Sequence, residues 1–176
     1  MVVSVDIIHV FKYPIHLVVN THFMKYPTEK EKFVLKVETI ERHIDWTKGI
    51  DYRRRLAFCQ NVIPRIMRKF SFLNEKEFLL EEEAWLNLHN NSLKIKSRNI
   101  TWANYAQMCE ESKFVPSEDN PNWTKFEQHG QVSIINFGPF SQVLEIFAGK
   151  FLLKGAHKAL SIMEELLYEK STSRDT

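Results

Sequence analysis

Histidine, cysteine and serine are all present in this chain, but none is spaced for a familiar catalytic or metal site. The seven histidines include no His-x-x-x-His pair, and Cys59 and Cys109 lack the Cys-x-x-Cys spacing of a zinc site. The five glycines form neither a phosphate-binding loop nor a Gly-x-Ser-x-Gly turn that would expose a nucleophilic serine. We therefore expect no metal site, no cofactor and no enzymatic activity.

Three consecutive glutamates, Glu81 to Glu83, are the remaining candidate for acid and base catalysis. Side chains alternate between the two faces of a strand, so Glu82 would point away from both neighbours. Catalysis needs two groups that converge on one substrate, which this alternation prevents. A solvated sheet face is the simpler explanation of the run.

Basic residues are grouped in a way that suits anion binding. The chain has 24 Lys and Arg against 22 Asp and Glu, and its net charge of +2 gives no broad field that would attract nucleic acid. Any binding charge must therefore act locally. The groups are Arg53 to Arg55, then Arg65, Arg68 and Lys69, and finally Lys150, Lys154, His157 and Lys158.

Arg54 is the most informative of these cations. It shares strand parity with Leu56 and Phe58, so we expect its charge to point toward the interior, where a phosphate would satisfy it. A buried carboxylate partner or a place at the sheet margin would explain Arg54 equally well. A solvated helix face would likewise explain the lysines between 150 and 158.

The apolar pattern predicts the elements that must position these residues. Period-two alternation predicts strands near 3–11, 33–37, 52–58, 78–86, 93–102, 107–115 and 123–136, with turn residues between them. Pro14 and helical spacing up to Tyr26-Pro27 predict a short helix after the first strand. Apolar residues three and four apart from Leu144 to Leu166 predict one long amphipathic helix over 140–169.

Together these elements predict an α+β domain, in which a curved antiparallel sheet of about seven strands grips the long C-terminal helix. Such a grip can leave a cavity, and 13 Phe, four Trp and five Tyr are suited to lining it. Segment 64–72 mixes apolar and basic residues at short helical spacing and is expected to form an amphipathic lid. We expect one domain over 1–170, a polar tail over 171–176, and neither a cleavable presequence nor a membrane span.

Several separated motifs resemble one known family. The run from His9 to Pro14, followed by Lys25-Tyr26-Pro27, is similar to the opening of the PRELI/MSF1 domain, and Asn99-Ile100-Thr101 resembles its central strand. Segments 53–64 and 118–124 add to the likeness, which covers the chain from Val5 to about Lys170. Several matches in one order are more specific than any single motif.

The resemblance implies a START/PITP-like cavity that holds one phospholipid beneath a lid. It also implies transfer of phosphatidic acid or phosphatidylserine between membranes in the mitochondrial intermembrane space, with a small twin Cys-x9-Cys helical-hairpin partner of the TRIAP/Mdm35 type. A lipid-binding or protein-interaction module of the same fold that does not transport lipid is the alternative. This chain departs from the family at Thr28-Glu29 and at Phe33, which leaves the headgroup open.

Two sets of site residues follow from these considerations. Those expected to bind the headgroup are Lys25, Arg54, Lys150, Lys154 and Lys158. Those expected to form the lid and contact anionic membranes are Arg65, Met67, Arg68, Lys69, Phe70 and Phe72.

Overall fold

A computed structural model describes residues 2–135 and 138–173 of the chain, without the side chains of Phe72 and Pro139. Its elements, in chain order, are β1 (Val2–Phe11), α1 (Ile15–Met24), β2 (Val34–Asp45), β3 (Ile50–Gln60), the 3-10 helix η1 (Ser71–Leu73), β4 (Glu77–Asn87), β5 (Ser92–Asn99), β6 (Ala106–Pro116), β7 (Thr124–Ile134), the 3-10 helix η2 (Gly138–Phe140) and α2 (Ser141–Thr172).

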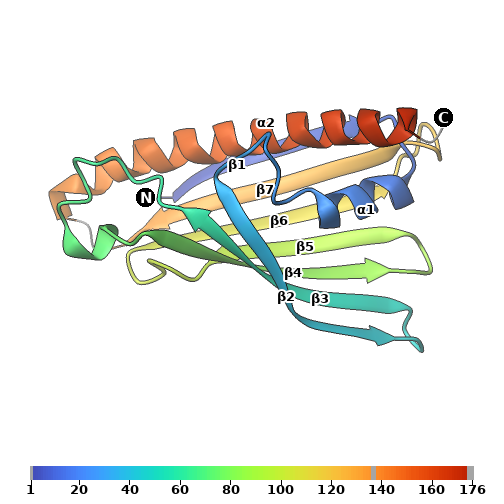
Figure 1. Cartoon of the computed structure of the whole chain (residues 1–176), viewed down its shortest axis with the longest axis horizontal. Helices are drawn as coiled ribbons and strands as arrows, with labels where there is room; N and C mark the ends of the chain where they lie inside the picture. Colours follow the sequence, from blue (N-terminus) through green and yellow to red (C-terminus); the bar gives the residue numbers. More distant parts are fainter. Residues whose placement is uncertain (1, 136–137, 174–176) are drawn as a thin grey trace.

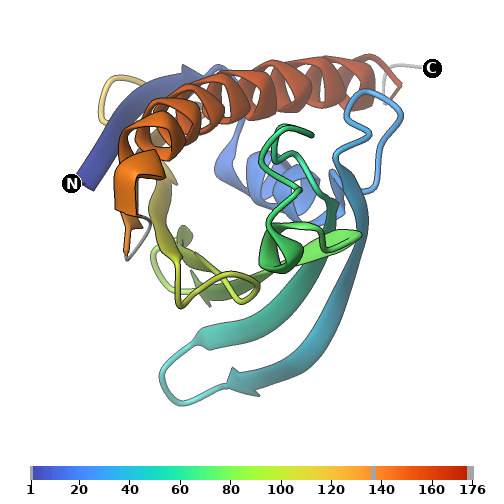
Figure 2. The ribbon, with the colours of Figure 1, turned by 90° about the vertical axis from the view of Figure 1, so that its left-hand side faces the viewer.

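The strands form one antiparallel sheet in the order β1-β7-β6-β5-β4-β3-β2. The first strand joins the last, with Val2 opposite Ser133 and Phe11 opposite Thr124. The sheet curls around the underside of α2, which runs the length of the molecule (Figures 1 and 2). The predicted α+β fold, a curved sheet gripping a long terminal helix, is confirmed.

Aromatic side chains from three strands form the centre of the main core. Phe11, Phe114 and Phe126 pack together, with ring centroids of Phe114 and Phe126 4.7 Å apart. Met163 and Leu167 of α2 close this cluster from above, because the helix turns its apolar stripe toward the sheet. At the other end of α2, a Cβ on Gly149 would lie only 2.9 Å from Val3 Cγ1. A glycine there lets the helix approach β1 closely.

Several boundaries differ from the sequence prediction; strand β2, for example, continues to Asp45 rather than ending near residue 37. Segment 64–72 forms turns followed by η1 rather than an amphipathic helix, with bonds such as Met67 N to Pro64 O that span only three residues. Strand β5 ends at Asn99, whose side chain bonds the carbonyls of Thr101 and Ala106 and so begins the loop. Helix α2 continues to Thr172, and residues 174–176 of the expected tail lie outside the described residues.

Candidate functional site

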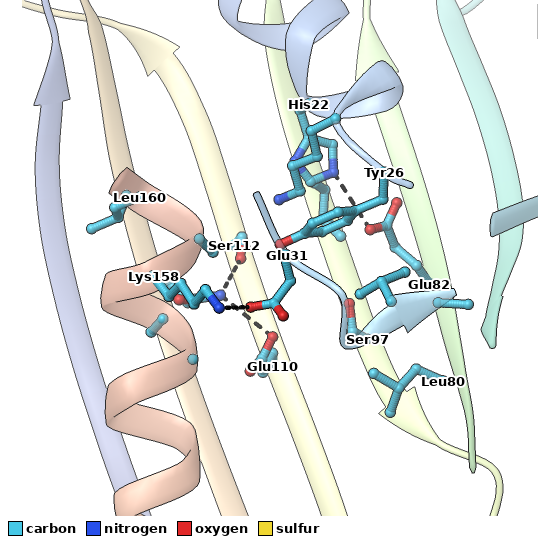
Figure 3. A pocket seen from close by; sticks show the side chains of 18 of the residues that line it. His22, Tyr26, Glu31, Leu80, Glu82, Ser97, Glu110, Ser112, Lys158 and Leu160 are labelled. Atoms are coloured by element: carbon cyan, nitrogen blue, oxygen red, sulfur yellow. Dashed lines mark hydrogen bonds and ion pairs between the residues drawn. The ribbon is translucent and has the colours of Figure 1, made fainter. Parts of the chain in front are cut away.

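A cavity of about 420 Å³ lies between the inner face of the sheet and α2 (Figure 3). Ligand sites of proteins commonly have volumes of this order. Its apolar walls come from both layers: Phe33, Val34, Val37, Ala57, Leu80, Ile95, Met108, Phe114, Phe126, Phe151, Leu152, Leu160 and Met163. Helix α2 contributes small residues here, Gly155, Ala156 and Ala159, and a Cβ on Gly155 would meet no atom within 4 Å. These small side chains leave part of the space between the helix and the sheet unfilled.

A smaller apolar cavity of about 100 Å³ continues the first toward the lid segment. The two share Val62, Met108 and Phe151 as lining residues. Ile63 and Leu73, at the two ends of the lid segment, form part of the wall of the smaller cavity. The lid segment therefore covers the smaller cavity, which adjoins the main one.

Charged residues are concentrated in the main cavity, although they are surrounded by apolar walls. Arg55 of β3 donates to Glu82 Oε1 of β4 from Nη2 at 2.6 Å and from Nε at 2.9 Å, and its Nη1 donates to the carbonyl oxygen of Phe23 at 3.1 Å. Burial opposes ionisation of Glu82, but His22 and Arg55 outweigh it and lower the pKa of this carboxyl. The Arg55–Glu82 pair is therefore ionised and internally satisfied.

His22 of α1 stands beside this pair as a neutral ring. Its Nε2 lies 3.4 Å from both Glu82 Oε2 and Arg55 Nη2. Burial, with the nearby charge of Lys25, lowers the pKa of His22 to about 4. Its Nδ1 atom is buried without a hydrogen-bond partner in the described part of the chain. The ring thus fills space at the cavity wall without adding a charge at neutral pH.

Lys25 is a cation inside the cavity that Glu82 and Glu110 attract only from a distance. It caps the C-terminus of α1, and its Nζ lies 5.1 Å from the centroid of the Tyr26 ring. Among the described residues it forms no ion pair. Burial lowers its pKa to about 8, so the group is still mainly protonated at neutral pH. An ammonium held in this way, inside an apolar cavity, is suited to receiving an anion.

The loop between α1 and β2 contacts α2 beside the cavity. Lys158 Nζ pairs with Glu31 Oε2 at 2.8 Å, as Figure 3 shows, and Lys30 Nζ contacts Glu165 and Glu169 at 2.9 Å each. Lys154 also lines the cavity and is exposed. These contacts hold the loop against the helix.

The predicted headgroup residues are only partly brought together. Lys25, Lys154 and Lys158 line the cavity, whereas Lys150 is exposed on α2 and does not line it. The expectation that Arg54 points inward is wrong: its Nε pairs with Glu41 at 3.1 Å and its Nη1 with Glu81 at 3.4 Å, on the other face of the sheet. Arg55, one residue later, faces the cavity instead.

The glutamate run is also different from the solvated face that we expected. Glu82 points into the cavity, and Glu81 is buried on the opposite face, where Arg98 Nη2 approaches it to 2.6 Å. Both carboxylates are therefore paired with arginines rather than with water. Residues that the sequence reasoning missed are Arg55, Glu82 and Glu110, which all line the cavity.

Within the lid segment, residues 64–72, some side chains pack or bond inward and others are exposed to solvent. Met67 is 6% exposed and packs with Ile63, Leu73 and Leu144, so its predicted membrane contact would require the segment to open. Phe70 is half-buried, with its ring 5.5 Å from that of Phe140. Arg68 bonds inward, whereas Arg65, Ile66 and Lys69 are exposed. The side chain of Phe72 lies outside the described part of the structure.

Arg68 connects the lid segment to its own base. Its Nε donates to the carbonyl oxygen of Ile63 at 2.7 Å, and its Nη2 donates to that of Asn61 at 2.6 Å. Asn61 in turn donates from Nδ2 to the carbonyl oxygens of Leu73 and Glu75. Both ends of the segment are thus joined by hydrogen bonds, which gives it a closed loop form without a helix.

The described residues contain no cluster of three metal-ligating side chains. Among the described helices, none is both long and apolar enough to cross a membrane.

Solved structures of similar architecture show the class of fold. The chain superposes on an aromatase/cyclase from a Streptomyces species with a TM-score of 0.63 and 11% identity, over 97% of this chain and 96% of the other. A START superfamily protein from Mycobacterium smegmatis gives a TM-score of 0.57 and 9% identity, over 94% of this chain and 97% of the other. The sheet, the terminal helix and the cavity between them define a START-like fold.

Sequence comparison adds the family. A model described as the PRELI-like family matches residues 16–173, and the chain therefore belongs to that family. It is 27% identical to a slowmo homologue of Dictyostelium discoideum over 82% of this chain, and 25% identical to an UPS-like protein of Schizosaccharomyces pombe over 72%. This chain spans 62% and 67% of the lengths of those two relatives. Family and fold together indicate a lipid-binding protein.

Proposed function

We propose that this protein is a phospholipid carrier. It would extract one anionic phospholipid, phosphatidic acid or phosphatidylserine, from one mitochondrial membrane and release it at the other. The observation that carries this proposal is the cavity itself: its walls are largely apolar, and Lys25 stands within it as a cation without an ion-pair partner among the described residues. Such a site offers one surface to acyl chains and another to a phosphate.

Shielding of the acyl chains supplies the main driving force. Each methylene group removed from water contributes about 0.8 kcal/mol, so a lipid leaves its bilayer only if the carrier replaces the apolar surroundings. Phe33, Phe151 and Leu80 offer such surroundings next to the charged group. A charge-assisted hydrogen bond from Lys25 to the phosphate would then orient the headgroup. No step in this process needs a covalent bond to break.

The lid segment offers a route for the lipid. Its exposed residues, Arg65, Ile66 and Lys69, would meet lipid phosphates and the interface of an anionic membrane. Outward movement of the segment would withdraw Met67 and Ile63 from the cluster beside Leu144 and expose the smaller cavity. Met67 and Phe70 would then join the membrane contact.

Residence in the intermembrane space and a small twin Cys-x9-Cys helical-hairpin partner are part of this proposal. Membership of the PRELI-like family supports both, since the resemblance that runs through the chain implies them. Copurification of such a partner from mitochondria with the tagged chain would be the expected result. Recovery of the chain only from the cytosol would contradict the location.

Lipid transfer between liposomes tests the carrier function. Gly155→Leu should narrow the lipid cavity and reduce transfer several-fold, because a side chain at this position would extend into open space. Gly155→Ala is the matched control: it adds a single methyl group, and a stabilisation of the helix by up to about 1 kcal/mol should leave transfer near the wild-type rate.

Native mass spectrometry of the purified protein gives an independent result. A carrier should copurify with about one phospholipid, chemically unchanged on recovery, whereas an enzyme would return an altered lipid. Absence of bound lipid together with absence of transfer would refute the carrier and favour a module that only recruits a partner.

Charge on the lid can be tested in the same assay. Ile66→Asp with Phe70→Asp should slow transfer to anionic liposomes, because both changes oppose insertion into the interface. Unchanged transfer by this double variant would remove the proposed role of the lid segment.

A further inference from the structure

Most charges that line the cavity already have a partner. Arg55 is paired with Glu82, and Lys158 is paired with Glu31. Three charged side chains that line the cavity remain outside these pairs and the Arg98–Glu81 pair: Lys25, Glu110 and Lys154, of which Lys154 is exposed. Lys25 at the end of α1 and Glu110 on β6 attract each other electrostatically but form no ion pair in the described part of the chain.

Glu110 is held in place by neutral groups. Gln128 of β7 donates from Nε2 to Glu110 Oε2 at 3.4 Å and to Ser112 Oγ at 3.2 Å (Figure 3 labels Glu110 and Ser112). Gln128 and Ser112 also line the cavity. The weak amide contact leaves most of the acceptor capacity of the carboxylate directed at the cavity. Burial raises the pKa of Glu110, and a cationic ligand would oppose that effect.

A ligand with an anion alone does not match this arrangement. The phosphate of phosphatidic acid would satisfy Lys25, the cation that attracts Glu110, but it would also place a second anion beside this buried carboxylate, and the two anions would repel each other. A headgroup that carries both a phosphate and a primary ammonium would satisfy both residues. The ammonium has three N–H donors, and the carboxylate, Ser112 Oγ and the Gln128 amide oxygen are acceptors.

We propose that Glu110, with Gln128 and Ser112, forms a subsite for the primary ammonium of an aminophospholipid headgroup, while Lys25 receives its phosphate. This inference rests on the proposed carrier function and narrows its ligand. The ligand class is a glycerophospholipid whose headgroup bears an –NH₃⁺ group, as phosphatidylserine and phosphatidylethanolamine do. Phosphatidylcholine lacks N–H donors, and phosphatidic acid lacks the cation, so both are excluded from the subsite.

A competition experiment tests the ligand class with the unaltered protein. The protein is incubated with liposomes that contain equal amounts of phosphatidylserine, phosphatidylethanolamine, phosphatidylcholine, phosphatidylglycerol and phosphatidic acid, and extracted lipid is identified by native mass spectrometry. We expect the two amine-bearing lipids to exceed each of the others by about tenfold, the scale of one charge-assisted hydrogen bond.

Variants assign the preference to its residue. Glu110→Gln keeps the shape of the side chain and removes its charge, so the preference should fall to about twofold or less while total extraction persists. Glu111→Gln is the matched control, because Glu111 is the next residue on β6, is exposed and pairs with Lys96 at 2.8 Å. Circular dichroism confirms that each variant is folded, and Glu110→Asp, which keeps the charge, should retain part of the preference.

Each outcome is decisive. Extraction of lipid without preference for the amine-bearing class overturns the subsite and leaves the carrier function standing. A preference that Glu110→Gln leaves intact also overturns the subsite. Extraction of no lipid by the wild-type protein overturns the carrier function and the subsite together.

Discussion

Removal of the Lys25 ammonium should make the lipid-free protein more stable and a poorer binder of lipid. Burial lowers the pKa of Lys25 from 10.5 to about 8. At 1.36 kcal/mol per pKa unit, this fall corresponds to roughly 3 kcal/mol in favour of the unfolded state at neutral pH. Lys25 is partly exposed, so solvent screens part of its charge, and we expect Lys25→Met to raise the free energy of unfolding by about 1–3 kcal/mol.

The sign of the pH dependence follows from the same values. The unfolded chain holds the Lys25 proton more tightly than the folded one, so this group lowers stability as pH falls from 10.5 to about 8, and its full cost is present at pH 7. The wild-type protein should therefore gain stability between pH 8 and 10 relative to Lys25→Met. That difference between the two proteins isolates Lys25 from other groups that titrate in this range.

Urea unfolding followed by tryptophan fluorescence measures both the free energy of unfolding and its dependence on pH. For a domain of this size, each kcal/mol of added stability should raise the thermal midpoint of Lys25→Met above that of the wild type by about 2–4 °C. Loss of the phosphate contact should weaken lipid extraction by about tenfold. Lys32→Met, on the same loop but exposed, should change neither property. A less stable Lys25→Met protein, or an unchanged difference between pH 8 and 10, would refute this account of the buried charge.

Three further changes should alter stability. Burial lowers the pKa of His22 to about 4, so the stabilising effect of the neutral ring is complete above pH 6.5 and is lost toward pH 4. His22 should therefore lower the free energy of unfolding, measured in urea, by about 2 kcal/mol between pH 7 and pH 5, and His22→Phe should remove that part of the pH dependence. Gly49→Ala should lower the thermal midpoint by a few degrees, because φ is +63°, a backbone conformation that costs an L residue about 1–2 kcal/mol; an unchanged midpoint would contradict the strain. Arg68→Met should speed limited proteolysis within segment 64–72, because two hydrogen bonds to its base are lost, whereas Arg65→Met should not.

The sheet could be predicted from the sequence because its strands alternate in polarity. Leu93 and Ile95 of β5, and Phe126 and Val132 of β7, are buried on one face while their neighbours are more exposed. The long helix was equally clear from its apolar stripe. Segment 64–72 could not be predicted in this way, because its spacing fits a helix while hydrogen bonds from Arg68 hold it as a loop.

The sequence prediction places the wrong face of β3 toward the interior, because charged residues lie on its inner face and apolar residues on its outer face. Leu56 and Phe58 lie on the outer face with Arg54, whereas Arg53 and Arg55 share the inner parity with Cys59, which is fully buried. A charged cavity requires polar residues where a plain core would have apolar ones. The period-two pattern therefore identifies the strand correctly but assigns the wrong face of β3 to the cavity.

Lys25 and Glu110 illustrate two different limits of sequence reasoning. Lys25 was found only through the family resemblance, since a lysine after a helix is ordinary by itself. Glu110 carried a usable signal, because it shares strand parity with Met108 and Phe114, and all three line the cavity. A single carboxylate on the apolar side of a strand can mark a ligand contact.

The position of β2 at the edge of the sheet has a consequence for contacts between copies of the protein. Its backbone offers unpaired hydrogen-bonding groups to any neighbouring copy, yet Lys36, Glu38, Glu41 and Arg42 stand along it, and its pairing with β3 is interrupted twice by register shifts. Charge and irregularity of this kind discourage strand addition. Under the proposed carrier mechanism, molecules with an open lid segment would therefore meet at a membrane surface without aggregating along this strand.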